Sequence, residues 1–190
     1  YNLKEALTIK RNPSVVANDL MSIFFYNNEQ PLDLIYNQQH PVKFARKNDA
    51  AIQVTTNDLS STIRFPANTD TQYLVIGITS SKLASLIGTE SSNHIVRTMT
   101  GGASSFLYLE SMNAEIQQIL KNITLVNMNG ELSNFFVRIK VQELLYHLIN
   151  KLSERENTFQ RPISNADAER LIVVRNTILS NLSEPPVLRK

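Results

Sequence analysis

The sequence contains no cysteine, and its formal net charge is only +2 over 190 residues. The absence of cysteine excludes a disulfide scaffold, a thiolate zinc site and a cysteine nucleophile. No apolar run approaches the roughly 18 residues that a membrane-spanning helix needs. The small net charge also gives no overall electrostatic footprint for nucleic acid. We therefore expect a globular protein without a membrane span, for which the cytoplasm is the default location.

The common signatures of catalytic and metal sites are also missing. His40, His94 and His147 lie far apart, and the sequence has no His-x-His pair of the kind that metal-binding cupins carry. The sequence has no Gly-x-Ser-x-Gly elbow, and Gly101-Gly102 lacks the Lys-Ser/Thr of a phosphate-binding loop. We therefore expect no metal, no cofactor and no enzyme activity.

What the sequence does contain is enough apolar residues, 42%, to build the core of one domain or of one domain and part of a second. Before residue 80 these residues alternate with polar ones, which is typical of short strands. Turn-type residues separate the runs, and this pattern predicts an antiparallel sandwich or barrel. The most hydrophobic run, 72–78, predicts a central strand that is buried on both faces. The predicted strands are 21–25, 32–36, 42–46, 51–55, 62–65 and 72–78.

The second half of the chain has helical periodicity. A short helix is expected at 80–88, capped by Ser80 and closed by Gly88, and a long polar loop at 89–105. Two helices are expected at about 112–153. The apolar stripe of the second helix is wide, so it either packs under the sheet or meets the same helix of a partner subunit. The seam predicted for such a dimer consists of Val137, Val141, Leu144 and Leu148.

A third helix is expected from Ser164 or Asn165 to the turn at Pro185-Pro186, after which a further helix would begin. This segment resembles the first helix and turn of the DNA-binding domain in the AraC/XylS family of bacterial transcription regulators. The segment from Phe106 to Met112, with Ile119-Leu120 and 143–145, is similar to the regulatory-domain helices of one branch of that family. The terminal residues that carry the resemblance are Ile172, Arg175, Ile178, Leu179, Asn181, Pro185, Pro186 and Leu188.

The resemblance implies an α+β fold: an N-terminal antiparallel β-sandwich or barrel of cupin-like type, two packed helices and one terminal helix. It implies a regulatory domain at 1–160, with strands at about 14–78 and helices at about 112–153. Residues 164–190 would then begin a helix-turn-helix domain whose recognition helices lie after Lys190. By this analogy the fragment senses a small effector, forms a homodimer, or does both, and it reaches DNA only through the missing C-terminal module.

The candidate ligand-binding residues are polar and aromatic groups on the strands: Tyr36, Phe44, Arg64 and Tyr73. An Arg64 that points inward would need a carboxylate or an anionic ligand, whereas alternation with two apolar neighbours also allows it to face water. Two other functions remain open: a purely structural dimerisation domain that binds no ligand, and a cupin-like enzyme, which would hold a metal.

Overall fold

The computed structural model describes residues 2–13, 19–28, 30–36, 42–44, 50–88, 91–102, 105–125, 130–156 and 174. The chain separates into two compact units, Tyr1–Thr158 and Phe159–Lys190. In the second unit the predicted terminal helix lies outside the described residues except for Val174, which is helical and exposed. Everything below concerns the first unit.

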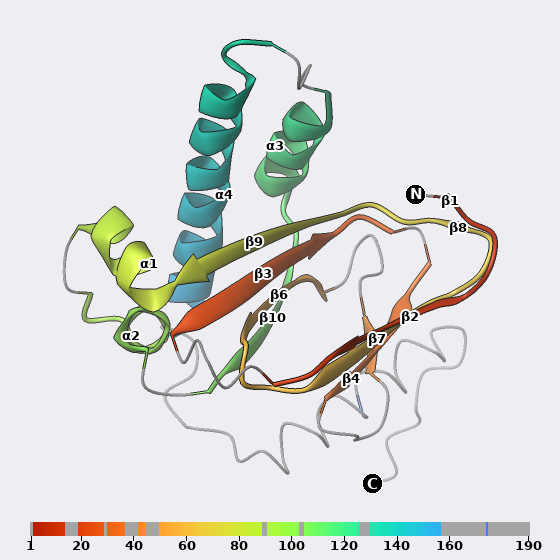
Figure 1. Ribbon diagram of the computed structural model, residues 1–190. Helices are drawn as coiled ribbons and strands as arrows, with labels where there is room; N and C mark the ends of the chain where they lie inside the picture. The colour runs from red at the N-terminus through yellow and green to blue at the C-terminus, as the bar shows by residue number, and fades with distance from the viewer. Residues whose placement is uncertain are drawn as a thin grey trace, which may run out of the picture. The chain divides into compact units, whose positions relative to one another are not determined.

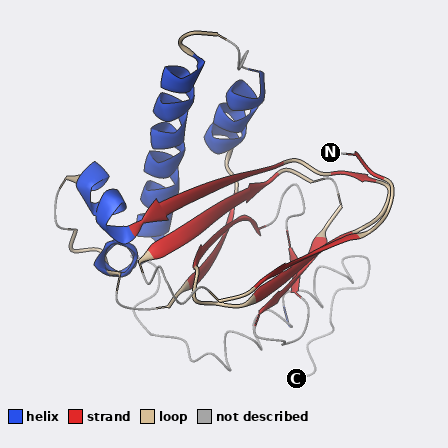
Figure 2. Ribbon diagram, viewed as in Figure 1, coloured by secondary structure: helices blue, strands red, loops and turns tan. Residues whose placement is uncertain are grey.

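The first unit has the predicted α+β architecture of antiparallel strands followed by helices (Figures 1 and 2). The strands before the first helix are β1 (Asn2–Leu3), β2 (Leu7–Arg11), β3 (Leu20–Tyr26), β4 (Leu32–Tyr36), β5 (Val42–Phe44), β6 (Ala50–Thr56), β7 (Ser61–Phe65), β8 (Thr69–Asp70) and β9 (Tyr73–Thr79). They are followed by α1 (Ser80–Ile87), α2 (His94–Gly101), β10 (Leu107–Ser111), α3 (Ala114–Leu125) and α4 (Ser133–Glu156).

The strands form two antiparallel four-stranded sheets and one short pair, β1–β8. We call the sheet with the order β10-β6-β3-β9 the helix-side sheet, because the helices pack on one of its faces. The sheet with the order β2-β7-β4-β5 faces its other side, and we call it the distal sheet. Side chains on a strand point alternately to the two faces, so the central strands of the helix-side sheet, β3 and β6, contribute to two different interiors.

Strand β3 shows how one sequence serves both interiors. Met21, Ile23 and Phe25 are almost completely buried between the helix-side sheet and the helices. Phe24 and Tyr26 point the other way and pack with the distal sheet. The helical core is completed by apolar residues of every helix: Leu83, Val96, Met99, Ile116, Ile119, Leu144, Leu145, Leu148 and Leu152.

Strand β9 departs from the predicted central strand. It lies at the edge of the helix-side sheet, next to β3 only. Ile76 and Ile78 are buried toward the helices, but Tyr73 and Val75 on the opposite face are each 43% exposed. The prediction of burial on both faces was wrong because a continuous apolar run does not reveal whether the sheet continues beyond it.

Five elements were missed in the sequence: the short pair β1 and β8, and also α2, β10 and β2. The predicted loop at 89–105 contains α2, which the Asn93 side chain caps by accepting from the Val96 amide over 3.1 Å. The segment after Phe106, which looked helical by resemblance, forms β10 beside β6. Strand β2 begins well before residue 14, where the first strand was expected. In contrast, Gly88 closes α1 in the left-handed conformation, φ 74°, as predicted, while Thr79 rather than Ser80 caps it.

Candidate functional site

The interior between the two sheets is unusually polar for a sandwich. Gln53 and Thr55 of β6 have no exposed surface. Tyr26 of β3 donates its hydroxyl to Gln53 Oε1 over 3.3 Å, and Gln53 Nε2 donates to the hydroxyl of Tyr36 on β4. Hydrogen bonds therefore link the two sheets through the buried interior between them.

Both tyrosines of this network have raised pKa values. For Tyr26 the main cause is burial, which disfavours the phenolate. Burial also raises the pKa of Tyr36, against the opposing effects of a hydrogen bond with Thr55 and the positive charge of Arg11. Both phenols therefore stay protonated at neutral pH and act as neutral hydrogen-bond donors and acceptors.

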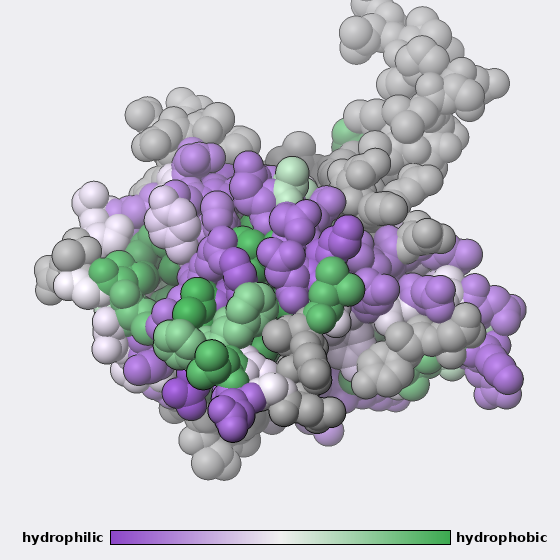
Figure 3. Space-filling model, turned by 90° about the horizontal axis from the view of Figure 1, so that it is seen from above, coloured by the Kyte–Doolittle hydropathy of each residue, from purple (hydrophilic) through white to green (hydrophobic). Residues whose placement is uncertain are grey.

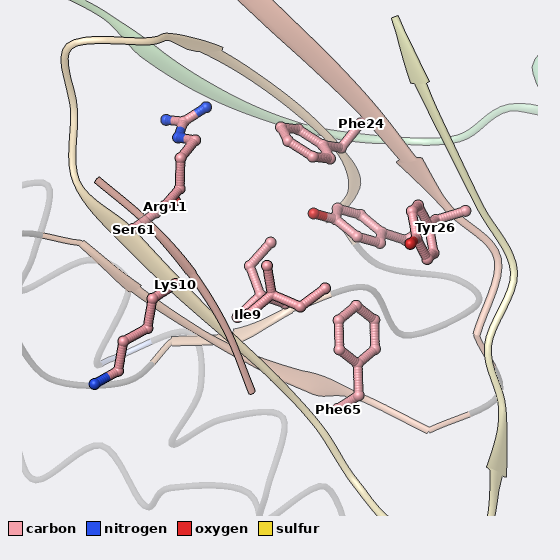
Figure 4. Close-up of a pocket in the computed structure, with 9 residues that line it drawn as sticks. Ile9, Lys10, Arg11, Phe24, Tyr26, Ser61 and Phe65 are labelled. Carbon is pink, nitrogen blue, oxygen red and sulfur yellow. The ribbon is translucent and has the colours of Figure 1, made fainter. Parts of the chain in front are cut away.

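A cleft of about 190 Å³ opens beside this network, between β2 and β7 of the distal sheet and β3 and β9 of the helix-side sheet (Figure 4). We call it the inter-sheet cleft. Two aromatic pairs form much of its wall: Phe24 and Tyr26, with parallel rings 5.8 Å apart, and Phe65 and Tyr73, 6.1 Å apart. Its lining consists of Ile9, Lys10, Arg11, Phe24, Tyr26, Ser61, Ile63, Phe65 and Tyr73.

Arg11, the last residue of β2, lies at one side of this cleft. Its Nη2 donates to Thr55 Oγ1 over 3.3 Å, which places the guanidinium between the two sheets. It also donates to the backbone oxygens of Thr56 and Leu59 over 3.2 and 3.1 Å, and Nη1 reaches Asn57 Oδ1 at 3.5 Å. Burial lowers the pKa of Arg11, although the side chain remains charged at neutral pH.

The four predicted ligand-binding residues do not all meet. Tyr36 lies in the polar network and Tyr73 lines the inter-sheet cleft. Arg64 is exposed on the outer face of β7, opposite Asp33 of β4, so it faces water. Phe44 belongs to β5, but its side chain lies outside the described part of the chain.

Arg11 was not among the predicted residues, although the sequence held a signal for it. Leu7, Ile9 and Arg11 occupy alternate positions of one strand and therefore share a face. Ile63 and Phe65 share the inner face of β7 and place Arg64 between them on the outer face. Period-two alternation thus favours Arg11, rather than Arg64, as the inward arginine.

The predicted dimer seam on α4 needs correction. Leu144 and Leu148 have no exposed surface, because they pack into the core shared with the helix-side sheet. Val137 and Val141 are partly buried, and Val141 packs against the same core. These side chains, Leu144 and Leu148 above all, are therefore occupied within the subunit.

A different apolar row on α4 is exposed. Phe135, Ile139 and Tyr146 are 61%, 44% and 61% exposed, and Leu132 just before the helix is 73% exposed. They recur at intervals of three, four and seven residues, which places them on one side of the helix. We call Leu132, Phe135, Ile139 and Tyr146 the α4 stripe. Figure 3, which looks down on the helices, shows apolar residues gathered among hydrophilic ones on this side of the protein.

Within the described residues, no group of three or more histidine, aspartate or glutamate side chains is arranged to hold a metal ion. Nor does any helix in those ranges have the length and apolar character needed to cross a membrane.

Comparison with known proteins shows similarity at the level of the fold. No family model matches the sequence, and no curated protein matches it. Among solved structures, an apo variant of ToxT from Vibrio cholerae is similar, with a TM-score of 0.54 and 14% identity over 95% of this chain and 73% of that chain. A second ToxT structure from Vibrio cholerae gives a TM-score of 0.48 and 11% identity, over 96% of this chain and 67% of that chain. The chain thus shares its fold with ToxT at low sequence identity.

Proposed function

We propose that this chain is the regulatory part of an AraC-like transcription regulator and that the inter-sheet cleft binds a small effector. The observation that carries the proposal is the cleft itself, because it combines aromatic walls with a buried polar network. Small-molecule sites are typically apolar cavities with a few well-placed polar groups. The likeness in fold to ToxT, an AraC-family regulator, supports the same architecture. Contact with DNA would be made by the DNA-binding module of such a regulator.

The size of the cleft limits the effector. At about 190 Å³ it is smaller than the roughly 300 Å³ at which drug-sized pockets begin. It is larger than the roughly 150 Å³ cavity that is known to take up benzene in an engineered protein. A compact ligand with one ring, or a short chain of similar volume, therefore fits it best.

A thermal-shift screen of small metabolites tests effector binding. A true effector raises the Tm of the 190-residue chain in proportion to the logarithm of its concentration above the Kd. Ile9→Trp places a large side chain in the inter-sheet cleft, and it should abolish this shift. Thr8→Trp is the matched control, because Thr8 is an exposed neighbour on β2 that does not line the cleft. A ligand shift that survives Ile9→Trp, or a screen without any hit, would contradict effector binding in this cleft.

Dimerisation is a second candidate function, and the α4 stripe favours it. Large exposed apolar side chains in a row are costly in a monomer and are typical of interaction surfaces. Their three- and four-residue spacing is the pattern by which one helix packs against another. We therefore propose a second copy of the chain as the occupant of the stripe, since one helix face can be self-complementary about a two-fold axis.

Sedimentation velocity tests this second candidate. The chain should form a dimer that Ile139→Asp dissociates, because a carboxylate would then be buried without a partner. Asn134→Asp, an exposed position on another side of α4, should leave the dimer intact. A parent chain that stays monomeric at high concentration would remove this candidate and leave effector binding untouched.

A further inference from the structure

The outer edge of β9 presents backbone groups that the helix-side sheet does not use. Gln72 accepts from the residue after β3 over 2.9 Å, and Ser80 donates to the residue before β3 over 2.9 Å. Backbone bonds in an antiparallel ladder join every second residue, so the even-numbered residues of β9 bond to β3. Val75 and Gly77 therefore direct their N–H and C=O groups to the other side, where no further strand lies among the described residues.

This edge lacks the features that keep other strand edges from pairing. Sheet edges are normally protected by charged side chains, proline or bulges. The other edge strands of the two sheets carry charged residues: Glu110 in β10, Lys10 in β2 and Lys43 in β5. Strand β9 has no charged residue and no proline, and it pairs with β3 without a bulge. It is therefore suited to accept a further strand.

The side chains along this edge fit a second copy of the same strand. Val75 is 43% exposed, and a Cβ atom placed on Gly77 would meet no atom of the described chain within 4 Å. Two antiparallel copies of β9 related by a two-fold axis at Ile76 place each Val75 opposite a Gly77. The valine side chain then occupies the open space above the glycine, and no charge is buried at the contact.

The α4 stripe is placed to take part in the same contact. In the view of Figure 1, the N-terminal half of α4 projects beyond β9. A two-fold axis perpendicular to the sheet keeps the helices of both copies on one face, so the projecting halves approach each other across the axis. Specific interfaces bury about 1,200–2,000 Å² in total, which is large for one strand edge alone. The edge and the stripe together are therefore better matched to a stable dimer than either surface by itself.

We propose that two copies of the chain pair through the β9 edge, with Val75 opposite Gly77, and that the α4 stripe packs in the same two-fold interface. This inference rests on the proposed dimerisation and adds a contact between sheets that the stripe does not supply. In each such pair the two residues exchange both backbone hydrogen bonds, and the helix-side sheets of the two copies become one continuous sheet. The backbone pairing fixes the register of the subunits, whereas the stripe contributes apolar area.

Amide hydrogen exchange followed by NMR tests the edge pairing in the unmodified chain. The reference is Ile139→Asp, at a concentration at which sedimentation shows that variant to be monomeric. The amides of Val75 and Gly77 should exchange about tenfold or more slowly in the dimeric parent than in this monomer. The amides of Leu74 and Ile76 are the internal control: they bond to β3 in both states, and their exchange should change less.

A pair of variants tests the same contact through the strength of the dimer. Val75→Pro removes an amide that points out of the sheet and leaves the bonds to β3 in place, so proline is tolerated there as on other edge strands. We expect it to raise the dimer Kd about tenfold or more, because backbone hydrogen bonds of the interface are lost. Val75→Thr keeps the amide and the shape of the side chain, and it should leave the Kd within about threefold.

Each other outcome has a separate meaning. If the chain dimerises while Val75 and Gly77 exchange as fast as in the monomer, the edge pairing is overturned and the dimer through the α4 stripe remains. If these amides are equally slow in the monomer, the edge is covered within the subunit, and the pairing is overturned as well. A parent chain that stays monomeric overturns both the edge pairing and the proposed dimer. Should Val75→Pro fail to fold, the exchange of the two amides in the parent chain still decides the question.

Discussion

Arg155, one residue before the end of α4, donates through Nε to Glu110 of β10 over 2.8 Å. Lys151, one turn earlier, lies 3.7 Å from the other oxygen of the same carboxylate. The Glu110 side chain is only 8% exposed, so it cannot exchange these partners freely for water. The C-terminal end of α4 is therefore fastened to β10, at the edge of the helix-side sheet.

Removing the negative charge of Glu110 should destabilise the first unit. We expect Glu110→Gln to lower the free energy of unfolding by about 1–2 kcal/mol, because the charged partners are themselves partly exposed and screened. Glu143→Gln is the control: its pair with Lys140 is a surface contact between neighbouring turns and should contribute less than about 0.5 kcal/mol. Urea denaturation measures both values. Equal stability of the two variants would show that the bond to Arg155 contributes no more than a surface pair.

Shortening a side chain to alanine should change the stability of the protein by different amounts on the two faces of α4. Leu148→Ala removes a fully buried side chain and should cost about 2–5 kcal/mol. Phe135→Ala removes an exposed one, and its cost at low protein concentration should stay within about 0.5 kcal/mol. Chemical denaturation with parallel sedimentation checks both, because Phe135→Ala should weaken the dimer instead. A large loss of monomer stability in Phe135→Ala would mean that the stripe belongs to the core.

The Gly101-Gly102 pair, which lies in the segment predicted as a long polar loop, ends α2. Gly102 has φ 66°, whereas Gly101 is helical with open space around it. Gly102→Ala forces a side chain into the left-handed region and should cost about 1 kcal/mol. Gly101→Ala should be neutral or stabilise by up to about 1 kcal/mol, as alanine favours a helix. Melting curves of the two variants test this, and a similar change in both would argue against the left-handed turn.

Alkaline pH should weaken the polar network between the sheets. Below about pH 10, Tyr26 and Tyr36 are neutral in both the folded and the unfolded chain, so the stability from their raised pKa values is fully present. Above that pH, Tyr26 and Tyr36 ionise in the unfolded chain but stay protonated in the folded chain, where burial raises their pKa. The free energy of unfolding should then fall by about 1.4 kcal/mol per pH unit for each tyrosine, until the folded phenols ionise as well.

The contribution of the two tyrosines is isolated by comparing the slopes of the free energy of unfolding against pH, rather than its absolute values. Tyr26→Phe/Tyr36→Phe removes hydrogen bonds at every pH, but it should flatten the decline above about pH 10. Urea denaturation at a series of alkaline pH values provides the slopes. An identical slope in the parent and the double variant would show that these two phenols do not carry the pH dependence.

The sequence predicted those elements whose local pattern agrees with their environment. Strands β3, β4 and β7 alternate because one of their faces is more deeply buried than the other. Strand β6 is buried on both faces, and its alternation is one of apolar and polar residues. Helix α4 was predicted because apolar residues recur at three- and four-residue spacing for several turns. Strand β10 was misread because the resemblance likened the segment from Phe106 to Met112 to regulatory-domain helices, whereas it pairs with β6.

The site was harder to predict because it depends on contacts between distant segments. Arg11 joins β2 to the end of β6 across more than 40 residues, and nothing local distinguishes it from Arg64 except the phase of alternation. The prediction of a dimer seam on α4 placed core residues such as Leu144 and Leu148 at an interface for a related reason. When apolar residues cover most of a helix, the sequence does not reveal which of them pack against the sheet and which remain on the surface.

A crystal structure of the chain soaked with the strongest hit of the metabolite screen tests the central claim, effector binding in the inter-sheet cleft, most directly. The account predicts density for the ligand against Phe24, Phe65 and Tyr73, which line the cleft. Ile9→Trp should remove this density. An empty cleft in crystals whose cleft is open to solvent, or a ligand bound elsewhere on the chain, would contradict the account.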